Sequence, residues 1–256
     1  MELPRNRLKE KLQSGYVSYG IWHGMVDTYA AEICAGAGFD WVMIDGEHTP
    51  FDFRSMLIHA QVMAAHESAV FVRPPIGDPV MLKQLLDAGI QNFLIPMVES
   101  AEQAKELVAA IHYPPKGKRG VGAALGRASQ WARIPDYIKT AAKELCLILQ
   151  VESVKGMKEL ENICQLDGVD GVFIGPADLA ASMGYPGEQV RDEVREEVKR
   201  GLHIIKSHNK ITGVLAFSEP YIQEYTEAGA NYIAICSDSL MLAESSSNMA
   251  RKYVKE

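Results

Sequence analysis

Eight short apolar runs recur along this chain of 256 residues, and a stretch with helical periodicity separates each run from the next. Several of these stretches are followed within one or two residues by glycine, as the C-termini of helices often are. Alternating strands and helices without a linker predict one domain, 1–256, built on a parallel sheet. The predicted strands are Tyr16–Ile21, Trp41–Asp45, Val70–Arg73, Asn92–Met97, Leu145–Val151, Gly171–Ile174, Ile211–Ala216 and Tyr232–Cys236.

The length of the chain and its hydrophobic content of 47% suit a sheet that closes around a single core. An open, doubly wound sheet is the alternative, because the order of strands along the chain does not reveal closure. No GxGxxG motif follows the first predicted strand, which argues against the dinucleotide-binding form of the open sheet. We therefore predict an α/β fold of the (β/α)8 TIM-barrel type.

Two segments depart from the alternating pattern. The connection between the fourth and fifth predicted strands, 98–144, contains the basic sequence YPPKGKRGVG. Long connections in compact domains are usually functional, and we expect this one to form a lid at the mouth of the substrate site. The tail Ser239–Glu256 predicts one further helix, which either covers its own barrel or reaches a neighbouring subunit.

Charge and composition argue against several classes of function. The formal net charge is −7 and the isoelectric point about 5.6, with no run of Lys or Arg suited to a phosphate backbone. The N-terminus lacks the apolar region of a signal peptide, and no apolar segment approaches the ~18 residues needed to cross a bilayer. Four cysteines occur without metal-finger spacing, as in proteins with reduced thiols. We expect a cytoplasmic protein that acts on a small molecule and binds neither nucleic acid nor membranes.

Two carboxylates follow strands that read as buried. Glu152 comes directly after CLILQV, and Asp178 follows GVFIGPA. Because the C-terminal ends of barrel strands carry the catalytic residues, these two acids are candidate ligands for Mg2+, Mn2+ or Co2+. The alternative is that each carboxylate only caps the positive end of the helix that follows it. Spacing alone does not separate the two interpretations.

Further polar residues lie at the ends of the second and third predicted strands, in IDGEH and VRPP. The planar guanidinium of Arg73 fits a carboxylate or an enolate, although a structural ion pair with Asp45 is the alternative. His48 follows Asp45 by three residues, close enough for the carboxylate to orient the imidazole as a general acid or base. A lone histidine is more often structural. We assign His23, which also lies near a strand end, no catalytic role.

Ordered blocks along nearly the whole chain resemble the HpcH/HpaI aldolase family of class II, metal-dependent pyruvate aldolases. The blocks are AAEICAGAGFDWVMIDGEH (30–48), FVRPP (71–75), LLDAGIQNFLIPMVESAEQA (85–104), YPPKGKRGVG (113–122), LQVES (149–153) and DGVFIGPADLAASMG (170–184). The resemblance implies a (β/α)8 barrel whose last helix is swapped between neighbouring subunits of a homotrimer or homohexamer.

The resemblance also implies roles for individual residues. The Glu and Asp of the family's QxE and GPxDL motifs bind the divalent cation, and here they are Glu152 and Asp178. The Asp–His pair of the DxEH motif, here Asp45 and His48, works with a metal-bound water as acid and base. The arginine after the third strand, here Arg73, stabilises the keto or enolate oxygen. The implied substrate contacts are Arg73, Gln150, Pro176, Ala177 and Leu215.

The implied reaction is the reversible cleavage of a 4-hydroxy-2-oxo acid to pyruvate and an aldehyde through a pyruvate enolate. An acyl-CoA lyase of the citrate-lyase-like branch and an oxaloacetate decarboxylase are alternatives that use the same enolate. A non-catalytic metabolite-binding barrel is a more distant one, and the presence of all the motif residues argues against it. Thr49 and His23 depart from the family pattern and leave the aldehyde open.

Overall fold

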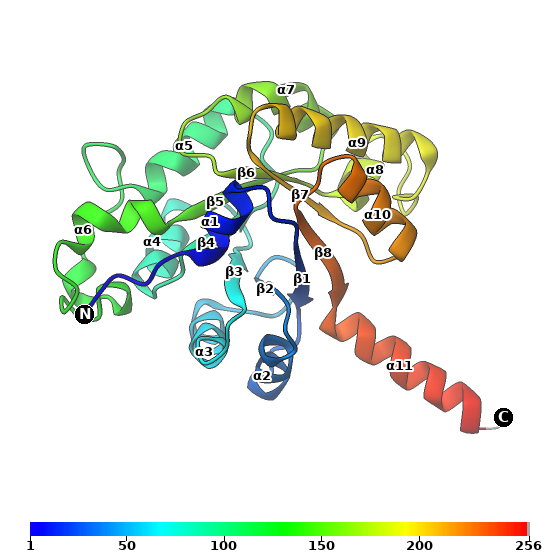
Figure 1. The fold of residues 1–256 in the computed structure, drawn as a ribbon, viewed down its shortest axis with the longest axis horizontal. Helices are drawn as coiled ribbons and strands as arrows, with labels where there is room; N and C mark the ends of the chain where they lie inside the picture. The colour runs from blue at the N-terminus through cyan, green and yellow to red at the C-terminus, as the bar shows by residue number, and fades with distance from the viewer. Residues whose placement is uncertain (255–256) are drawn as a thin grey trace.

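The computed structural model describes residues 1–254, in which eight parallel strands close into a barrel in sequence order (Figure 1). The predicted TIM barrel is therefore confirmed. The strands are β1 (Ser18–His23), β2 (Trp41–Asp45), β3 (Ala69–Arg73), β4 (Asn92–Ile95), β5 (Cys146–Val151), β6 (Gly171–Ile174), β7 (Ile211–Leu215) and β8 (Tyr232–Ser237).

Helices surround the barrel and follow its strands in turn. The α-helices are α1 (Arg7–Gln13), α2 (Thr28–Gly36), α3 (Phe53–Met63), α4 (Pro79–Asp87), α5 (Ala101–Ile111), α6 (Tyr137–Thr140), α7 (Val154–Cys164), α8 (Pro176–Ser182), α9 (Asp192–Ser207), α10 (Glu219–Glu227) and α11 (Asp238–Tyr253). Three short 3-10 helices lie between α5 and β5, namely η1 (Ala123–Leu125), η2 (Arg127–Ser129) and η3 (Ala141–Glu144).

The barrel closes where β1 pairs with β8 in parallel, aligning Ser18 with Tyr232 at one end and Trp22 with Ser237 at the other. This pairing rules out the open, doubly wound sheet. The first strand lies two residues further along the chain than predicted, because Trp22 and His23 still pair with β2.

Large side chains fill the barrel interior. The Trp41 ring stacks on the Tyr232 ring with centroids 4.1 Å apart. Gly20 leaves room for Trp41, since a Cβ at this position would lie 2.0 Å from the indole. Leu8 and Leu12 of α1 belong to the same buried cluster. Its other members are Trp22, Met43, Phe71, Leu94, Cys146, Ile148, Phe173, Ile211 and Ala234.

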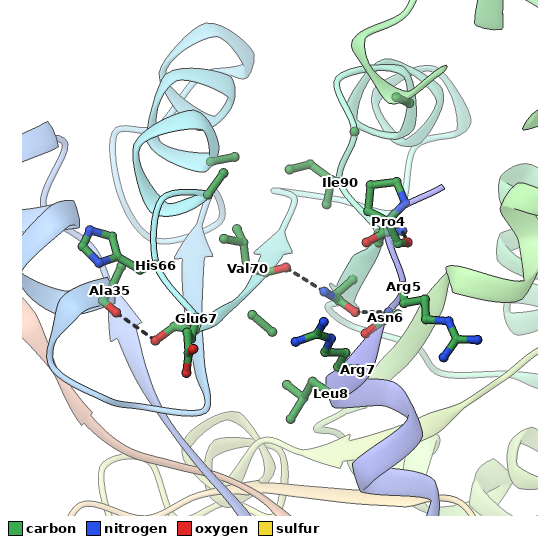
Figure 2. Close-up of a pocket in the computed structure, with 18 of the residues that line it drawn as sticks. Pro4, Arg5, Asn6, Arg7, Leu8, Ala35, His66, Glu67, Val70 and Ile90 are labelled. Atoms are coloured by element: carbon green, nitrogen blue, oxygen red, sulfur yellow. Dashed lines mark hydrogen bonds between the residues drawn. The ribbon is translucent and has the colours of Figure 1, made fainter. Parts of the chain in front are cut away.

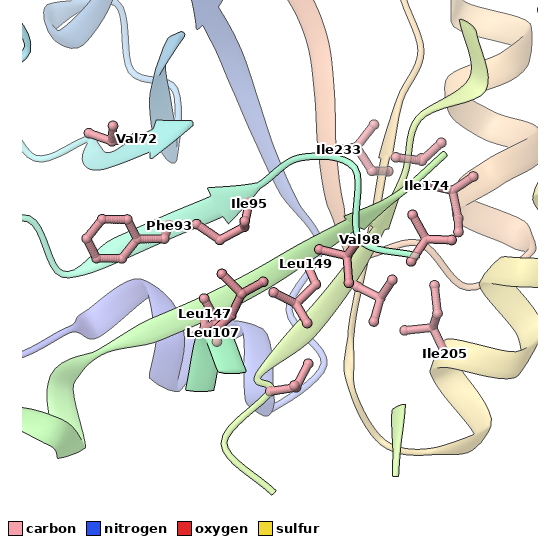
Figure 3. Packing of buried hydrophobic residues seen from close by; sticks show 14 of the residues in the cluster. Val72, Phe93, Ile95, Val98, Leu107, Leu147, Leu149, Ile174, Ile205 and Ile233 are labelled. Atoms are coloured by element: carbon pink, nitrogen blue, oxygen red, sulfur yellow. The ribbon is translucent and has the colours of Figure 1, made fainter. Parts of the chain in front are cut away.

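A second apolar layer lies between the strands and the surrounding helices (Figure 3). On β5, Leu147 and Leu149 belong to this outer layer, whereas Ile148 belongs to the interior. Burying a leucine side chain fully is worth roughly 1.5–3 kcal/mol, so the two layers together hold each strand firmly. The side chains at the strand ends consequently have fixed positions.

The alternation of side chains along the strands determines which strand-end residues face the barrel axis. On β2, Trp41 and Met43 face the interior, and Asp45 is the next residue at the same spacing of two. On β3, Arg73 follows the inward-facing Phe71 in the same way. The register places Asp45 directly opposite Arg73. The interior thus changes from apolar to charged at the C-terminal ends of the strands.

The long connection after α5 does not form the predicted lid. The backbone amides of Lys118 and Arg119 donate to carbonyls at the end of α5. The Arg119 guanidinium is buried and pairs with Asp87 at the end of α4, with 2.6 Å between Nη2 and Oδ1. Helices of a (β/α)8 barrel run back toward the N-terminal ends of the strands, so these contacts place 113–122 at the face opposite the predicted site.

A cavity of about 1060 Å³ lies at this N-terminal face (Figure 2). Residues 3–8 border it together with the segments that follow α2, α3 and α4. The Asn6 side chain is buried and donates to Asn92 Oδ1 at 2.6 Å, which fixes the N-terminal segment on β4. The predicted site residues all lie in the described part of the chain, and all but Asp45 line a different cavity.

The last helix, α11, projects away from the barrel (Figure 1). Its first residue, Asp238, is buried, and the rest of α11 is exposed. The tail helix predicted over Ser239–Glu256 is present as far as Tyr253, and Lys255 and Glu256 lie outside the described residues. Among residues 1–254, none of the helices has the length and apolar character required to cross a bilayer. The exposed apolar side chains of α11 are Leu240, Met241, Leu242, Met249 and Tyr253.

Candidate active site

A cavity of about 590 Å³ opens at the C-terminal ends of the strands. Of the nine residues predicted for the site, eight line this cavity and the ninth, Asp45, is buried and hydrogen-bonded to one of them, Arg73. The sequence prediction therefore brought together residues that are also neighbours in space. The eight lining residues are His48, Arg73, Gln150, Glu152, Pro176, Ala177, Asp178 and Leu215.

The Arg73 guanidinium is held on several sides. Its Nε and Nη2 donate to the two carboxylate oxygens of Asp45 at 2.9 and 2.7 Å, a bidentate contact. The guanidinium also lies over the Trp22 ring, 4.8 Å from its centroid. The remaining nitrogen, Nη1, donates to Gln150 Oε1 at 3.5 Å and lies 2.9 Å from Glu47 Oε2. The structural ion pair with Asp45 is thus present, and Nη1 reaches the residues that line the cavity.

The two carboxylates beside Arg73 differ in their acidity. Burial opposes ionisation of Asp45, but the hydrogen bonds and charge of Arg73 outweigh it and lower the pKa of Asp45. Burial raises the pKa of Glu47, and the charges of Arg73 and His48 offset this only in part. Glu47 Oε2 is near Arg73 Nη1 without the alignment of a hydrogen bond, so this buried oxygen has no hydrogen-bond partner. Both Asp45 oxygens accept hydrogen bonds from Arg73, whereas Glu47 Oε2 accepts none.

Glu152 does not cap the helix that follows it. Ser153 is the N-cap of α7, and its hydroxyl accepts the Gly156 amide at 3.1 Å. The Glu152 carboxylate instead accepts the Met97 backbone amide at 2.9 Å and the side-chain amide of Gln150. The helix-cap interpretation is therefore wrong for Glu152, which is buried at the edge of the cavity.

The surroundings of Glu152 fit a divalent cation. Burial, together with the negative charges of Asp178 and Glu47, raises the pKa of Glu152 to about 7 against the opposing effect of the two amide donors. Several carboxylates around one cavity repel one another, and a cation bound by oxygen ligands would remove that repulsion. Glu47 Oε2, which has no hydrogen-bond partner, is a further negatively charged oxygen beside this cavity. The donor set consists of oxygens alone, which suits Mg2+ and Mn2+ better than zinc.

Gly175 and the start of α8 line the cavity beside Glu152. A Cβ at position 175 would lie 2.5 Å from Glu152 Oε2, so only glycine allows the carboxylate to sit there. No side chain caps the N-terminus of α8, which leaves the amides of Ala177 and Asp178 free to bind an anion.

His48 occupies the outer part of the site, with 65% of its side chain exposed. Its backbone amide donates to Asp45 Oδ1 at 3.5 Å, while its Nε2 lies 3.7 Å from Glu47 Oε2. Among the described residues, the acidic neighbour of the imidazole is therefore Glu47. The predicted orientation of the His48 ring by Asp45 does not appear among these contacts, because both Asp45 oxygens bind Arg73.

The cavity also has an apolar wall that the sequence does not point to. Trp22 and Phe173 lie among the interior aromatics, and their ring centroids are 5.9 Å apart. Correct placement of the first strand would have identified Trp22, since it is an inward-facing residue at the end of β1. Phe173 is an inward-facing residue of β6, and the others lie outside the strands, in loops and in α10. The additional lining residues are Trp22, Phe173, Gln189, Val190, Ala216, Phe217, Ser218, Tyr221 and Tyr225.

Comparison with known proteins agrees with this geometry. The profile of the HpcH/HpaI aldolase/citrate lyase family matches residues 18–245. A hydroxypyruvate/pyruvate aldolase of Roseovarius nubinhibens is 47% identical over 253 residues, covering 99% of this chain and 98% of the relative. A 4-hydroxy-2-oxo-heptane-1,7-dioate aldolase of Salmonella paratyphi C is 44% identical over 249 residues, covering 97% of this chain and 95% of the relative.

A solved structure shows the same architecture. The crystal structure of an HpcH/HpaI aldolase/citrate lyase family protein from Burkholderia cenocepacia superposes with a TM-score of 0.93 at 34% identity, covering 98% of this chain and all of that one. The matched profile extends over the barrel and the strand ends that carry Arg73, Glu152 and Asp178. The chain belongs to the HpcH/HpaI aldolase/citrate lyase family and is, like these relatives, a carbon–carbon lyase of the aldolase type.

Proposed function

We propose that this chain is a metal-dependent, class II aldolase that reversibly cleaves 4-hydroxy-2-oxo acids to pyruvate and an aldehyde. The observation that carries the proposal is one cavity bordered by a fixed guanidinium, two acidic oxygen ligands and a free helix N-terminus. A 2-oxo acid presents a carboxylate and a keto oxygen, which are the groups that such an arrangement binds. The aldolase names of the relatives support the same reaction.

Glu152 and Asp178 would hold Mg2+, Mn2+ or Co2+, which when bound supplies Lewis-acid stabilisation of negative charge at the keto oxygen. Arg73 then stabilises the same oxygen as the enolate forms, from the position that Asp45 and Trp22 give it. Preorganised electrostatic contacts of this kind are worth about 3–4 kcal/mol each in catalysis. We assign Asp45 the task of positioning Arg73.

The other residues of the site bind the substrate or move protons. The amides of Ala177 and Asp178 bind the pyruvate carboxylate at the start of α8. Gln150 contacts both Arg73 and Glu152 and so lines the pyruvate pocket between them. His48, at the exposed edge, removes the 4-hydroxyl proton through water in the direction of cleavage. Leu215 of β7 faces the aldehyde portion of the substrate.

Chelation tests the proposal directly. We expect EDTA to abolish pyruvate release from 4-hydroxy-2-oxo acids and added Mn2+, Mg2+ or Co2+ to restore it, because Glu152 and Asp178 offer oxygen ligands to these ions. The assay couples pyruvate to NADH oxidation by lactate dehydrogenase. Full activity after complete removal of metal would refute the metal dependence.

A panel of substrates separates the proposed reaction from its alternatives. Malyl-CoA and citramalyl-CoA test for an acyl-CoA lyase, and oxaloacetate tests for decarboxylation through the same enolate. We expect 4-hydroxy-2-oxo acids to be cleaved with the highest kcat/KM. Preference for a thioester would instead assign the chain to the citrate-lyase-like reaction.

We further propose that the chain forms a homotrimer or homohexamer in which α11 packs on a neighbouring subunit. The exposed apolar side chains of a helix that projects from its own barrel support this assembly (Figure 1). Deleting residues 240–256 is expected to yield monomers by size-exclusion chromatography with light scattering, whereas deleting Lys255 and Glu256 alone preserves the oligomer. A multimer of unchanged mass after the longer deletion would show that α11 does not hold it together.

We also propose that 1–256 acts as one catalytic domain in the cytoplasm. All eight strands belong to the same barrel, and no further sheet is present among residues 1–254. All four cysteines are free thiols, which is consistent with a reducing compartment.

A further inference from the structure

A separate cluster of metal-ligating side chains lies between β1, α2 and the start of α11. His23, Cys34 and Asp238 each offer one ligand atom, and these atoms lie within 4.8 Å of one another. It is the one such group of three or more His, Cys, Asp or Glu residues within 1–254. The spacing in the sequence does not reveal it, because Asp238 of α11 lies far along the chain from His23 of β1 and Cys34 of α2.

The His23 imidazole is fully buried in this cluster. Its Nδ1 lies 2.7 Å from Asp238 Oδ2, while its Nε2 is buried without a hydrogen-bond partner. A carboxylate at Nδ1 accepts the ring proton, which leaves the lone pair on Nε2 unused. The two ring nitrogens point in different directions, so this lone pair does not face Asp238, and an ion held between Asp238 and the ring takes the place of the proton on Nδ1.

A second imidazole beside the cluster, that of His59, also has a buried ring nitrogen without a hydrogen-bond partner. The His59 ring lies 5.3 Å from the His23 ring between centroids, and its Nε2 is also buried without a partner. Its Nδ1 lies 2.7 Å from the Ser55 carbonyl, which holds the proton on that nitrogen. Two buried imidazoles with unused lone pairs therefore adjoin one thiol and one carboxylate.

The backbone holds the Asp238 carboxylate in place. The amides of Gly24 and Ser239 donate to Oδ1 at 2.9 and 2.6 Å, and the amide of Met25 donates to Oδ2 at 3.2 Å. The bonds from Gly24 and Met25 join the segment after β1 to the first residue of α11. The Asp238 carboxylate is therefore held in a fixed position in the cluster.

We propose that His23 Nδ1, Cys34 and Asp238 bind a borderline-soft divalent cation, Zn2+ or Co2+, at a site distinct from the Glu152–Asp178 pair, with the ring proton of His23 moving to Nε2. A set of nitrogen, sulfur and oxygen donors suits these ions, whereas the all-oxygen pair suits Mg2+ or Mn2+. The ion takes up Cys34 as the thiolate and releases its proton. Bound there, it links β1, α2 and α11.

Cobalt is the probe that distinguishes the two sites, because a cysteine ligand gives Co2+ an intense near-ultraviolet charge-transfer absorption and oxygen ligands do not. The reduced, chelator-treated full-length protein is titrated with Co2+ and the absorption recorded. We expect a thiolate–cobalt band that saturates at one ion per chain and disappears when Zn2+ is added. A folded wild-type protein without this band overturns the proposal.

Matched variants identify the ligands. Cys34→Ser is expected to abolish the band and His23→Gln to weaken Co2+ binding at least about tenfold, with folding checked by circular dichroism. Cys164→Ser, which alters a buried thiol of α7, should keep the band. Asp178→Asn should also keep it, so failure of the proposed catalytic metal site leaves this result intact. A band that survives in Cys34→Ser refutes the site, and its loss in Cys164→Ser does the same.

Discussion

Replacing Arg73 with lysine is expected to lower kcat for retro-aldol cleavage by about 10²–10³-fold, the usual loss when one preorganised donor to a developing oxyanion is removed. Lysine keeps the positive charge but loses the planar fork that binds both oxygens of Asp45 and lies over Trp22. The ammonium group is therefore no longer fixed beside Gln150 and the substrate oxygen. Steady-state kinetics with a coupled pyruvate assay measures the effect.

The matched control is Asp45→Asn, which keeps an acceptor for the guanidinium and removes one negative charge. We expect a smaller fall in kcat than in Arg73→Lys, because Arg73 itself remains in the site. Lysine is preferred over alanine at position 73, since alanine would leave Asp45 as an unpaired buried charge and cost about 3–5 kcal/mol of stability. An Arg73→Lys enzyme within threefold of the wild-type kcat would show that Arg73 does not stabilise the enolate.

Replacing Glu152 with glutamine is expected to abolish metal binding while making the metal-free protein more stable at neutral pH. The carboxyl has a pKa of about 7 in the folded protein, raised by burial and by the charges of Asp178 and Glu47 from its ordinary 4.5. The folded state therefore binds the proton more tightly than the unfolded state. Ionising Glu152 above pH 7 costs the folded protein on the order of 3 kcal/mol, which the neutral amide avoids.

The difference in stability between Glu152→Gln and the metal-free wild type should increase with pH. As pH rises from about 4.5 to about 7, the metal-free wild type loses stability that Glu152→Gln retains, and below about 4.5 the two proteins converge. Above pH 7 we expect the variant to unfold about 6–12 °C higher by calorimetry in EDTA. Saturating Mn2+ should stabilise the wild type but leave the variant unchanged. A variant less stable than the metal-free wild type at pH 8 would show that the ionised Glu152 carboxylate does not destabilise the folded protein.

Local sequence patterns are sufficient to predict the strands and the end of the sheet that carries the predicted site, although closure into a barrel is shown only by the pairing of β1 with β8. An apolar run fixes both the extent of a strand and its inward-facing residues, so Asp45, Arg73 and Glu152 follow directly from the runs before them. The same reasoning fails at β1. Its predicted position is two residues early, and Trp22 is therefore left beyond the strand and outside the predicted site.

Contacts between distant segments cannot be predicted in this way. From the sequence, the Asp45 carboxylate could pair with either Arg73 or the His48 imidazole. Only the packed structure shows that it binds Arg73 and that the acidic neighbour of the imidazole is Glu47. The location of 113–122 depends on the ion pair between Arg119 and Asp87, which lie 32 positions apart. A glycine-rich basic segment has the same local sequence whether it covers a substrate or packs under the barrel.

The pairing of β1 with β8 also has a consequence for synthesis on the ribosome. The first strand is made before the other seven, yet its partner on one side is β8, the last of the eight to be made. Until β8 leaves the exit tunnel, β1 presents an unpaired edge that other nascent chains can join. Translation of the segment that carries β8 thus completes the barrel, and a pause before it would prolong exposure to aggregation.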